Sequence, residues 1–170
     1  MNEGKTIPYT ERIKTKLTRY DILADKIKIA NDSATVNILK FKKTGVHYIE
    51  LRRKDIGGFT VNLRIDEAVN LSNITDEDLK KINQYSLPAD KRKKRIKIYP
   101  KIPLSTGKTT CFIQKDDKTE LYKLKKYDVN LCQWRSTKIN LEIIKDLHDL
   151  LQQFGFTNNN GELKSQYKNF

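Results

Sequence analysis

The stretch KINLEIIKDLHDLLQQFG, residues 138–155, carries the clearest periodic pattern in the chain. Its large apolar residues recur at spacings of three and four, which gathers them on one side of an α-helix. These residues are Ile143, Ile144, Leu147, Leu150, Leu151 and Phe154. Asn140 can cap the helix at its N-terminus, and Gly155 can adopt the left-handed backbone that ends it. The stretch therefore predicts a short strand followed by an amphipathic helix.

The segments before this helix alternate apolar and polar residues, a pattern typical of strands. They are TTCFIQK (109–115), TELYKLKKY (119–127) and VNLCQWRST (129–137). The first half of the chain has the same pattern in ATVNILKFKK (34–43), VHYIELRR (46–53) and GFTVNLRI (58–65). In that half the apolar positions share one face, and Tyr48, Arg52 and Arg64 lie on the other. An antiparallel sheet that is covered on one side has this distribution.

Two further helices are expected outside these strands. Residues 10–30 place Ile13, Leu17 and Ile27 near a 3.6-residue period, which predicts an N-terminal helix. The acidic stretch TDEDLKKINQYSLPAD (75–90) predicts the start of a second helix, because Thr75 is a good N-cap and three acidic residues follow it. The sequence thus indicates an α+β fold with antiparallel sheets, an N-terminal helix and a C-terminal amphipathic helix.

A short internal similarity bears on how the chain is organised. VNLRI at 61–65 resembles INLEI at 139–143, and each follows strand-like segments. This similarity leaves open an internal duplication of one sheet-helix unit. The expected divisions are an N-terminal helical segment (1–34), a first sheet-helix unit (35–90), a basic extended connector (91–108) and a second sheet-helix unit (109–170).

The chain is strongly basic, and the charge is concentrated. It has 170 residues with 34 Lys and Arg against 21 Asp and Glu, a formal charge of +13. An excess of this size indicates a polyanionic partner, nucleic acid ahead of an anionic membrane surface. The excess lies in LKFKKTGVHYIELRRK (39–54) and KRKKRIKIYPK (91–101), with an acidic stretch between them.

Basic side chains interleaved with aromatic ones favour single-stranded nucleic acid. Lysine and arginine neutralise phosphates, and aromatic rings stack on unpaired bases. The residues expected to bind are Lys40, Lys42, Lys43, Tyr48, Arg52, Arg53, Lys54, Arg64, Lys91, Arg92, Lys93, Lys94, Arg95, Lys97, Tyr122, Lys123, Lys125, Lys126, Trp134, Arg135 and Lys138. Trp134 is expected to face outward, on the assumption that Val129 and Leu131 face the core.

The order of strands, a terminal KINL strand and the helix EIIKDLHDLLQQF resembles the positive-cofactor-four type of transcriptional coactivator and its single-stranded-DNA-binding relatives, including Whirly-like proteins. The similarity covers residues 109–154, and Lys138, Ile139 and Leu141 match the family's terminal strand. It implies a curved sheet that binds single strands without strong sequence preference, with DNA ahead of RNA. It also implies a helix face that pairs two copies into a dimer. The expected dimerisation residues are Ile144, Leu147, Leu151 and Phe154.

The chain also departs from this family. The family's lysine and glycine before the terminal strand is present only as Thr137-Lys138, and 108 residues precede the matching region. If the duplication is real, both units lie in one chain and form an internal pseudo-dimer in place of a homodimer. A role in replication, transcription or genome maintenance, in a viral or mobile-element context, follows from this reading.

Other kinds of site find weaker support in the sequence. GKTT at 107–110 lacks the glycine that a phosphate-binding loop needs five residues earlier, where Ile102 stands, and a strand follows it. Cys111 and Cys132 form no CxxC pair, and the two histidines are scattered. We therefore expect no metal, no cofactor and no catalytic residues.

Three alternatives stay open. Glu50, Asp55 and Asp66 are near enough in sequence to raise the alternative of a metal-dependent nuclease. A second alternative is a packaging or assembly protein. KRKKR also fits a nuclear import signal, and no signal peptide or apolar membrane span is evident. The expected location is intracellular, in the nucleus or at a cytoplasmic site of genome replication.

Overall fold

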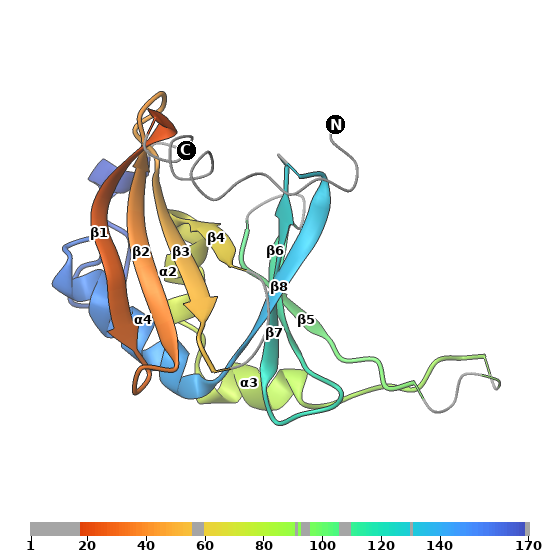
Figure 1. Ribbon diagram of the computed structural model, residues 1–170. Coiled ribbons are helices and arrows are strands. Elements are labelled where there is room, and N and C mark those ends of the chain that lie inside the picture. The colour runs from red at the N-terminus through yellow and green to blue at the C-terminus, as the bar shows by residue number, and fades with distance from the viewer. Residues whose placement is uncertain are drawn as a thin grey trace.

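Two four-stranded antiparallel sheets form the body of the protein (Figure 1). The computed structural model describes residues 18–55, 60–90, 92, 96–105, 110–129 and 131–168. Sheet 1 has the order β1 (Tyr20–Ile29), β2 (Ala34–Phe41), β3 (His47–Arg53) and β4 (Val61–Arg64). Sheet 2 has the order β5 (Lys101–Pro103), β6 (Cys111–Lys115), β7 (Tyr122–Asp128) and β8 (Gln133–Ile139). The helices are α2 (Ile65–Ser72), α3 (Asp76–Ile82), α4 (Leu141–Gln153) and the short 3₁₀ helix η2 (Ser165–Tyr167).

Both sheets follow the same plan. Each is a meander in which neighbouring strands pair in chain order, and each leads into a helix, β4 into α2 and β8 into α4. The predicted α+β class is therefore confirmed. The VNLRI and INLEI segments do not coincide in the fold, because Leu63 lies in β4 whereas its counterpart Leu141 begins α4. The common topology is compatible with duplication without establishing it.

Residue alternation explains which face of each sheet is covered. In sheet 1, Ile49, Leu51, Val61 and Leu63 are fully buried. In sheet 2, Ile113, Leu124 and Ile139 occupy the equivalent covered positions. These residues join one hydrophobic core that both sheets share with α2 and α4. We call the opposite side of each sheet its outer face.

The predicted N-terminal helix is wrong over Tyr20–Ile29, which forms the edge strand β1, whereas Thr18 and Arg19 are helical. The register between β1 and β2 shifts between Ile22 and Ala24 and again between Ala24 and Ile27. Such bulges insert extra residues into a strand, so its apolar positions lose their two-residue period. The resulting spacing resembles that of a helix. Residues 10–17 of the prediction lie outside the described residues.

The C-terminal helix agrees with its prediction. The Asn140 side chain accepts a hydrogen bond from the Ile143 backbone N–H at 2.9 Å, and Gly155 has a φ of +78°. These are the expected N-cap and the left-handed residue after the helix. α3 is also confirmed, since the Thr75 hydroxyl accepts from the Asp78 N–H at 3.2 Å and the Asp78 carboxylate accepts from the Thr75 N–H at 3.0 Å.

The two helices that follow the sheets both pack on the sheet 1 side of the body, where α2 contacts β3 and β4 and α4 contacts β1. α2 follows sheet 1, yet Asn70 donates to the Leu104 carbonyl beside sheet 2 at 2.6 Å. α4 follows sheet 2, yet its Asp146 accepts from the Ala30 N–H at the end of β1 at 2.7 Å. α2 and α4 also pack against each other. These contacts tie both halves into one body, and the sheets begin earlier than the expected divisions at residues 35 and 109.

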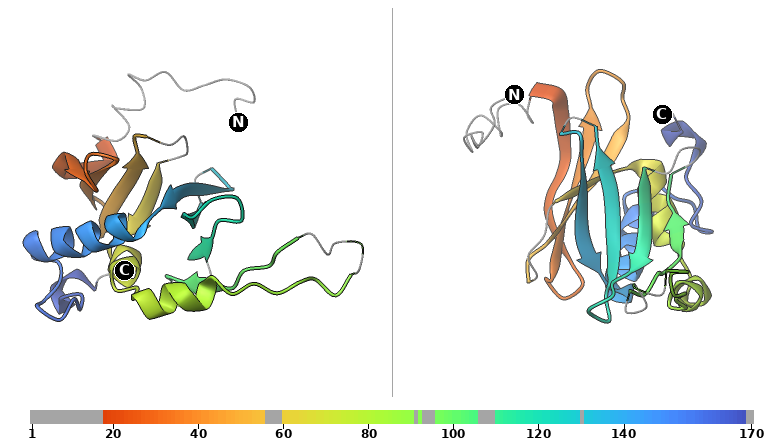
Figure 2. Two further views of the ribbon diagram at one scale, coloured as in Figure 1. Left: turned by 90° about the horizontal axis from the view of Figure 1, so that it is seen from below. Right: turned by 90° about the vertical axis from the view of Figure 1, so that its right-hand side faces the viewer.

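An arm projects from this body between α3 and β5. It comprises residues 83–100, of which 83–90, 92 and 96–100 are described. Ser86 and Ile98 pair across it through two backbone hydrogen bonds of 2.8 and 2.9 Å. Figures 1 and 2 show the arm extending away from sheet 2 into solvent. Of the predicted extended connector (91–108), residues 96–100 form the returning side of this arm, whereas Lys101–Pro103 form strand β5.

Candidate nucleic-acid interface

The outer face of sheet 2 carries a cluster of three aromatic rings. The Trp134 ring lies 5.5 Å from Phe112 and 5.6 Å from Tyr127, both in edge-to-face geometry. Phe112 is buried beneath its neighbours, whereas Trp134 is 45% exposed. In the right-hand view of Figure 2 the strands of sheet 2 stand in front of the helices. The cluster therefore offers an open aromatic surface to solvent.

Lysines surround this cluster on the same face. The Lys101 Nζ lies 4.4 Å from the centre of the Phe112 ring and the Lys125 Nζ lies 6.0 Å from it. The strand register places Lys123 and Lys138 opposite each other further along the same face. We call this surface the aromatic-lysine face. It consists of Lys101, Phe112, Lys123, Lys125, Tyr127, Trp134 and Lys138.

One buried carboxylate lies at the edge of the aromatic-lysine face. Asp116 is 3.4 Å from the Lys123 Nζ and 3.5 Å from the Lys138 Nζ, and it accepts a hydrogen bond from the Thr119 hydroxyl at 2.5 Å. Burial acts to raise the pKa of Asp116, but the Thr119 hydrogen bond and the two lysine charges outweigh it, so the pKa is lowered. Asp116 therefore holds both ammonium groups at the surface.

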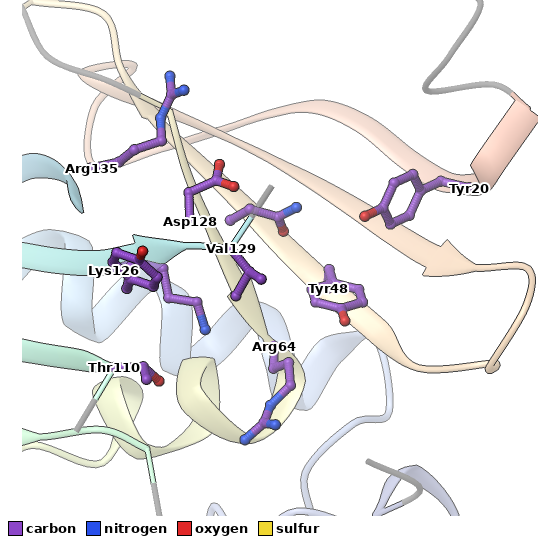
Figure 3. Close-up of a pocket in the computed structure, with 10 residues that line it drawn as sticks. Tyr20, Tyr48, Arg64, Thr110, Lys126, Asp128, Val129 and Arg135 are labelled. Atoms are coloured by element: carbon purple, nitrogen blue, oxygen red, sulfur yellow. The ribbon is translucent and has the colours of Figure 1, made fainter. Parts of the chain in front are cut away.

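A cleft lies between the outer face of sheet 1 and the end of the β7–β8 hairpin (Figure 3). Its volume is about 340 Å³, which is within the range of small-ligand pockets. The residues that line it are Tyr20, Tyr48, Asn62 and Arg64 from sheet 1, and Thr110, Lys126, Tyr127, Asp128, Val129 and Arg135 from around sheet 2. We call it the inter-sheet cleft. Tyr127 also belongs to the aromatic-lysine face, so the two surfaces are continuous.

Two tyrosines form the aromatic wall of the inter-sheet cleft. Their rings lie 5.9 Å apart in edge-to-face geometry, and Tyr20 also contacts Phe41 at 5.2 Å. Burial raises the pKa of Tyr20 and, against the opposing effect of the Arg64 charge, that of Tyr48. Both phenols consequently stay protonated at neutral pH and can donate hydrogen bonds from an uncharged ring.

Two cations of the cleft, Arg64 and Lys126, are held by carboxylates of α2. Arg64 makes two hydrogen bonds of 2.9 Å to Asp66, and the Lys126 Nζ lies 2.5 and 2.7 Å from the two oxygens of the buried Glu67. Glu67 Oε1 also accepts from the Arg64 N–H at 2.9 Å. These contacts orient the cations, and they also reduce the net positive charge of the cleft.

The predicted binding residues separate into several surfaces. The aromatic-lysine face contains Lys123, Lys125, Trp134 and Lys138, and the cleft contains Tyr48, Arg64, Lys126 and Arg135. Arg52 lies on the outer face of sheet 1, Lys42 and Lys43 lie in the β2–β3 turn, and Lys54 follows β3. Arg92 and Lys97 are exposed on the arm, and Lys91, Lys93, Lys94 and Arg95 lie outside the described residues.

Three predicted residues do not lie on these surfaces. Arg53 is only 7% exposed, because its guanidinium donates to Asp55 at 2.9 Å and to the Lys138 carbonyl at 2.8 Å. Tyr122 packs against the core and donates to Asn83 at 3.2 Å. Lys40 lies on the covered side of sheet 1, where it pairs across the strands with His47. Strand alternation accounts for the last two, since it places Lys40 with Val36 and Ile38, and Tyr122 with Leu124, on the covered sides.

The predicted dimerisation face is not available to a second copy. Ile144, Leu147 and Leu151 are buried within the chain, where α4 packs against α2 and sheet 1. Phe154 alone of the four is exposed, at 41%. The prediction of a helix face that pairs two copies is therefore wrong for these three residues, because the partner surface comes from the same chain.

Trp134 faces outward as predicted, but the argument for it was wrong. Val129 and Leu131 were expected in the core, yet they are 75% and 47% exposed in the β7–β8 turn. Cys132 has a φ of +50°, so the strand pattern does not extend through this turn. Trp134 is instead placed by its pairing with Tyr127 in the regular part of β8.

Sequence reasoning missed several residues of the two surfaces. Phe112 could have been found, because alternation in TTCFIQK places it opposite Cys111 and Ile113. Tyr20 was hidden by the predicted N-terminal helix. Lys101 was assigned to the connector, and only the pairing of β5 with β6 brings it over Phe112.

The carboxylates that raised the nuclease alternative do not gather. Glu50 accepts from Asn37 at 2.8 Å, whereas Asp55 binds Arg53 and Asp66 binds Arg64. Within the described ranges, no three His, Cys, Asp or Glu side chains are grouped so that they could hold a metal ion. Among the helices that the structure describes, none is both long and apolar enough to cross a membrane.

Comparisons with protein-family models, with curated proteins and with solved structures found no match to this chain. The resemblance to the positive-cofactor-four type therefore depends on the element order and the residues described above.

Proposed function

We propose that the protein binds single-stranded nucleic acid, with little dependence on sequence, across the aromatic-lysine face. The observation that supports this function best is the exposed Trp134 ring between Tyr127 and Phe112, with lysines on both sides. Every base has a flat face that can stack on such a ring, at about 1 to 3 kcal/mol per base. Stacking on bases requires that they are unpaired, so the surface favours single strands over duplex.

The lysines supply the sequence-independent part of the affinity. Lys101, Lys123, Lys125 and Lys138 are each exposed or half-buried. The ammonium groups of Lys101 and Lys125 lie beside the aromatic cluster, and those of Lys123 and Lys138 lie beside Asp116. Contacts to phosphates release counterions, so the affinity falls as salt is added. Because the phosphate backbone is the same in every sequence, this arrangement suits sequence-tolerant binding.

The inter-sheet cleft extends the proposed path of the strand. A strand that leaves Trp134 passes Tyr127, which belongs to both surfaces, and reaches Tyr20 and Tyr48. The cleft, at about 340 Å³, is large enough to receive a base. We infer that one base turns into it, with the tyrosine hydroxyls as hydrogen-bond donors.

The reciprocal packing of α2 and α4 favours an internal pseudo-dimer over a homodimer. α4 packs on sheet 1, α2 reaches the second half through the side chains of Asn70 and Glu67, and the two helices pack together. A chain that contains both halves needs no second copy to bury these helices. The proposed ligand is single-stranded DNA ahead of RNA, as the family resemblance implies, in replication, transcription or genome maintenance.

Fluorescence of the only tryptophan tests this function directly. Titration with oligo-dT at low salt is expected to quench Trp134 emission, because a stacked base contacts the ring. Trp134→Ala is expected to weaken binding by about 1 to 3 kcal/mol in fluorescence anisotropy. Phe154→Ala is the matched control, since Phe154 is 41% exposed at the far end of α4 and should have no effect. Emission that is indifferent to oligonucleotide would overturn the proposal.

The same assay separates the remaining alternatives. Labelled oligo-dT, oligo-U and a blunt duplex, each at two salt concentrations, are expected to rank with single-stranded DNA first. If duplex binds as tightly as single strands and Trp134→Ala has no effect, a packaging role based on charge alone is favoured instead.

A further inference from the structure

The arm carries an unusual amount of exposed apolar surface. Tyr85, Leu87, Ile96 and Ile98 are 50%, 56%, 52% and 46% exposed. Alternation along the returning strand places Ile96 and Ile98 on one side and Lys97 on the other, with the Lys97 Nζ 4.8 Å from the centre of the Tyr85 ring. Both sides of the arm therefore expose apolar or aromatic side chains to solvent, and the side with Tyr85 also carries the Lys97 cation.

A two-stranded ribbon of this kind is not stable by itself in water. In the described part of the arm, two backbone hydrogen bonds join Ser86 and Ile98, and the rings of Tyr85 and Tyr99 contact each other at 5.8 Å. At its base, the Gln114 side chain donates to the Tyr99 carbonyl at 2.7 Å. The rest of the ribbon extends beyond the body, so its apolar side chains are expected to become buried against a partner.

Charge identifies the kind of partner. Residues 91–101, KRKKRIKIYPK, contain no acidic residue, and Asp90 is the single acidic residue of the arm. An arm with this charge would be repelled by a second copy of itself and attracted to a polyanion. Apolar side chains on a basic ribbon match duplex nucleic acid, because DNA grooves admit a two-stranded ribbon and isoleucine or leucine can wedge between base steps.

The base of the arm adjoins the aromatic-lysine face. The arm leads directly into β5, whose first residue Lys101 lies over Phe112. In Figure 1 the arm projects from the side of sheet 2 that faces away from sheet 1, which is the side of that face. A nucleic acid on this side can contact both surfaces at once.

We infer that the arm grips a duplex groove while the aromatic-lysine face holds the adjoining single strand, so that the protein recognises junctions between single-stranded and double-stranded nucleic acid. This inference rests on the proposed single-strand function and adds a second binding surface to it. Two linked surfaces that engage one ligand raise its affinity above that of either surface alone. The arm residues that carry the duplex contact are Leu87, Ile96, Lys97 and Ile98.

Three labelled DNAs test the inference by fluorescence anisotropy with the full chain. They are oligo-dT, a blunt duplex, and the same duplex with an oligo-dT overhang, at one salt concentration. The overhang DNA is expected to bind at least about 10-fold more tightly than either separate part. Ile96→Ser combined with Ile98→Ser is expected to abolish this gain and leave oligo-dT affinity unchanged. Leu23→Ser is the matched control, since Leu23 is 50% exposed on β1, and it should preserve the gain.

The outcomes distinguish the two proposals. If oligo-dT binds but the overhang DNA binds no more tightly, or if the arm variant keeps the gain, the junction inference is overturned and the single-strand function stands. If oligo-dT itself does not bind, the proposed function fails. Sedimentation of the wild type and the arm variant completes the test. Self-association that the arm variant abolishes would identify a second copy as the arm's partner and would overturn the duplex assignment.

Discussion

The two sheets share one topology but present different surfaces to solvent. The outer face of sheet 1 combines Tyr48 and Arg52 with Glu50, which accepts from Asn37 at 2.8 Å. The outer face of sheet 2 has lysines around an aromatic cluster, and the Asp116 carboxylate that pairs with two of these lysines is buried. A common fold thus sets which side of each sheet is open, and the residues on that side decide what it can bind.

This difference also predicts which substitutions change stability and which change binding. The covered sides of both sheets contribute to one core, so changes there are expected to affect the whole molecule. The outer faces are tolerant of substitution, so changes there are expected to affect binding, and more strongly on sheet 2 than on sheet 1. Four substitutions test this contrast, from the largest expected effect to the smallest.

Leu147→Glu should affect both halves together. Leu147 is fully buried where α4 meets the core, and a charged group there has no partner. We expect a loss of about 4 kcal/mol or more in the free energy of unfolding, measured by urea denaturation. Lys145→Glu, which introduces the same group on the exposed side of α4, should cost little. A Leu147→Glu protein that stays folded and merely changes its oligomeric state would restore the dimerisation interpretation.

Arg53→Gln and Arg52→Gln compare neighbouring residues of β3 on its two sides. Arg53 is buried and bridges Asp55 to the Lys138 carbonyl of β8, so its loss should cost about 2 to 4 kcal/mol of stability. Arg52 is exposed, and its replacement should stay within about 0.5 kcal/mol. Denaturation curves measure both variants. Equal stabilities would mean that the bridge between the sheets contributes nothing.

Asp116→Asn should weaken the fold and strengthen binding. The folded-state pKa of Asp116 is lowered, so its carboxylate stabilises the protein above the pKa of the unfolded chain, near 4. Loss of the charge should cost about 1 to 2 kcal/mol at pH 7. The difference from wild type should decrease as the pH falls below about 4 and disappear once the folded carboxyl is protonated.

The same substitution is expected to have the opposite effect on affinity for nucleic acid. Lys123 and Lys138 lose their carboxylate partner in Asp116→Asn, so oligo-dT should bind more tightly in anisotropy at low salt. Weaker binding would show that Asp116 positions the lysines for phosphate contact and that this outweighs the charge that it neutralises.

The smallest effect concerns salt dependence. Lys101→Gln with Lys125→Gln removes two cations from the aromatic-lysine face, and the slope of log affinity against log salt should fall by about 1.4. Lys42→Gln with Lys43→Gln, in the exposed β2–β3 turn of sheet 1, should change the slope less. Equal changes for the two pairs would remove the distinction between the sheets.

Much of the fold could be predicted from local patterns. The α4 stripe, its caps at Asn140 and Gly155, and the alternation in β3 and β4 are each determined by residues within one element. The prediction failed at β1, because its two bulges arise from pairing with β2 and replace a strand period by a helix-like one. It failed also for Arg53, whose partners include a carbonyl 85 positions away.

The sequence predicted which residue types form the candidate site, but not which residues share one surface. Basic and aromatic residues in the strands indicated nucleic acid, yet sequence reasoning placed Tyr122 and Lys123 on one surface although they are consecutive in β7. Alternation separates such neighbours onto opposite faces. Lys101 and Phe112 joined the site only through the pairing of β5 with β6.

The sequence by itself determined the charge of this protein, the apolar side of each regular element and the caps of its helices, because these depend on residue type and on spacing within a few positions. Only the tertiary structure decided that α2 and α4 pack against each other within one chain, that Trp134 lies between Phe112 and Tyr127, and that residues 83–90 and 96–100 project as an arm. Those features depend on contacts between segments far apart in the chain, and no local pattern encodes which distant segment will supply the partner.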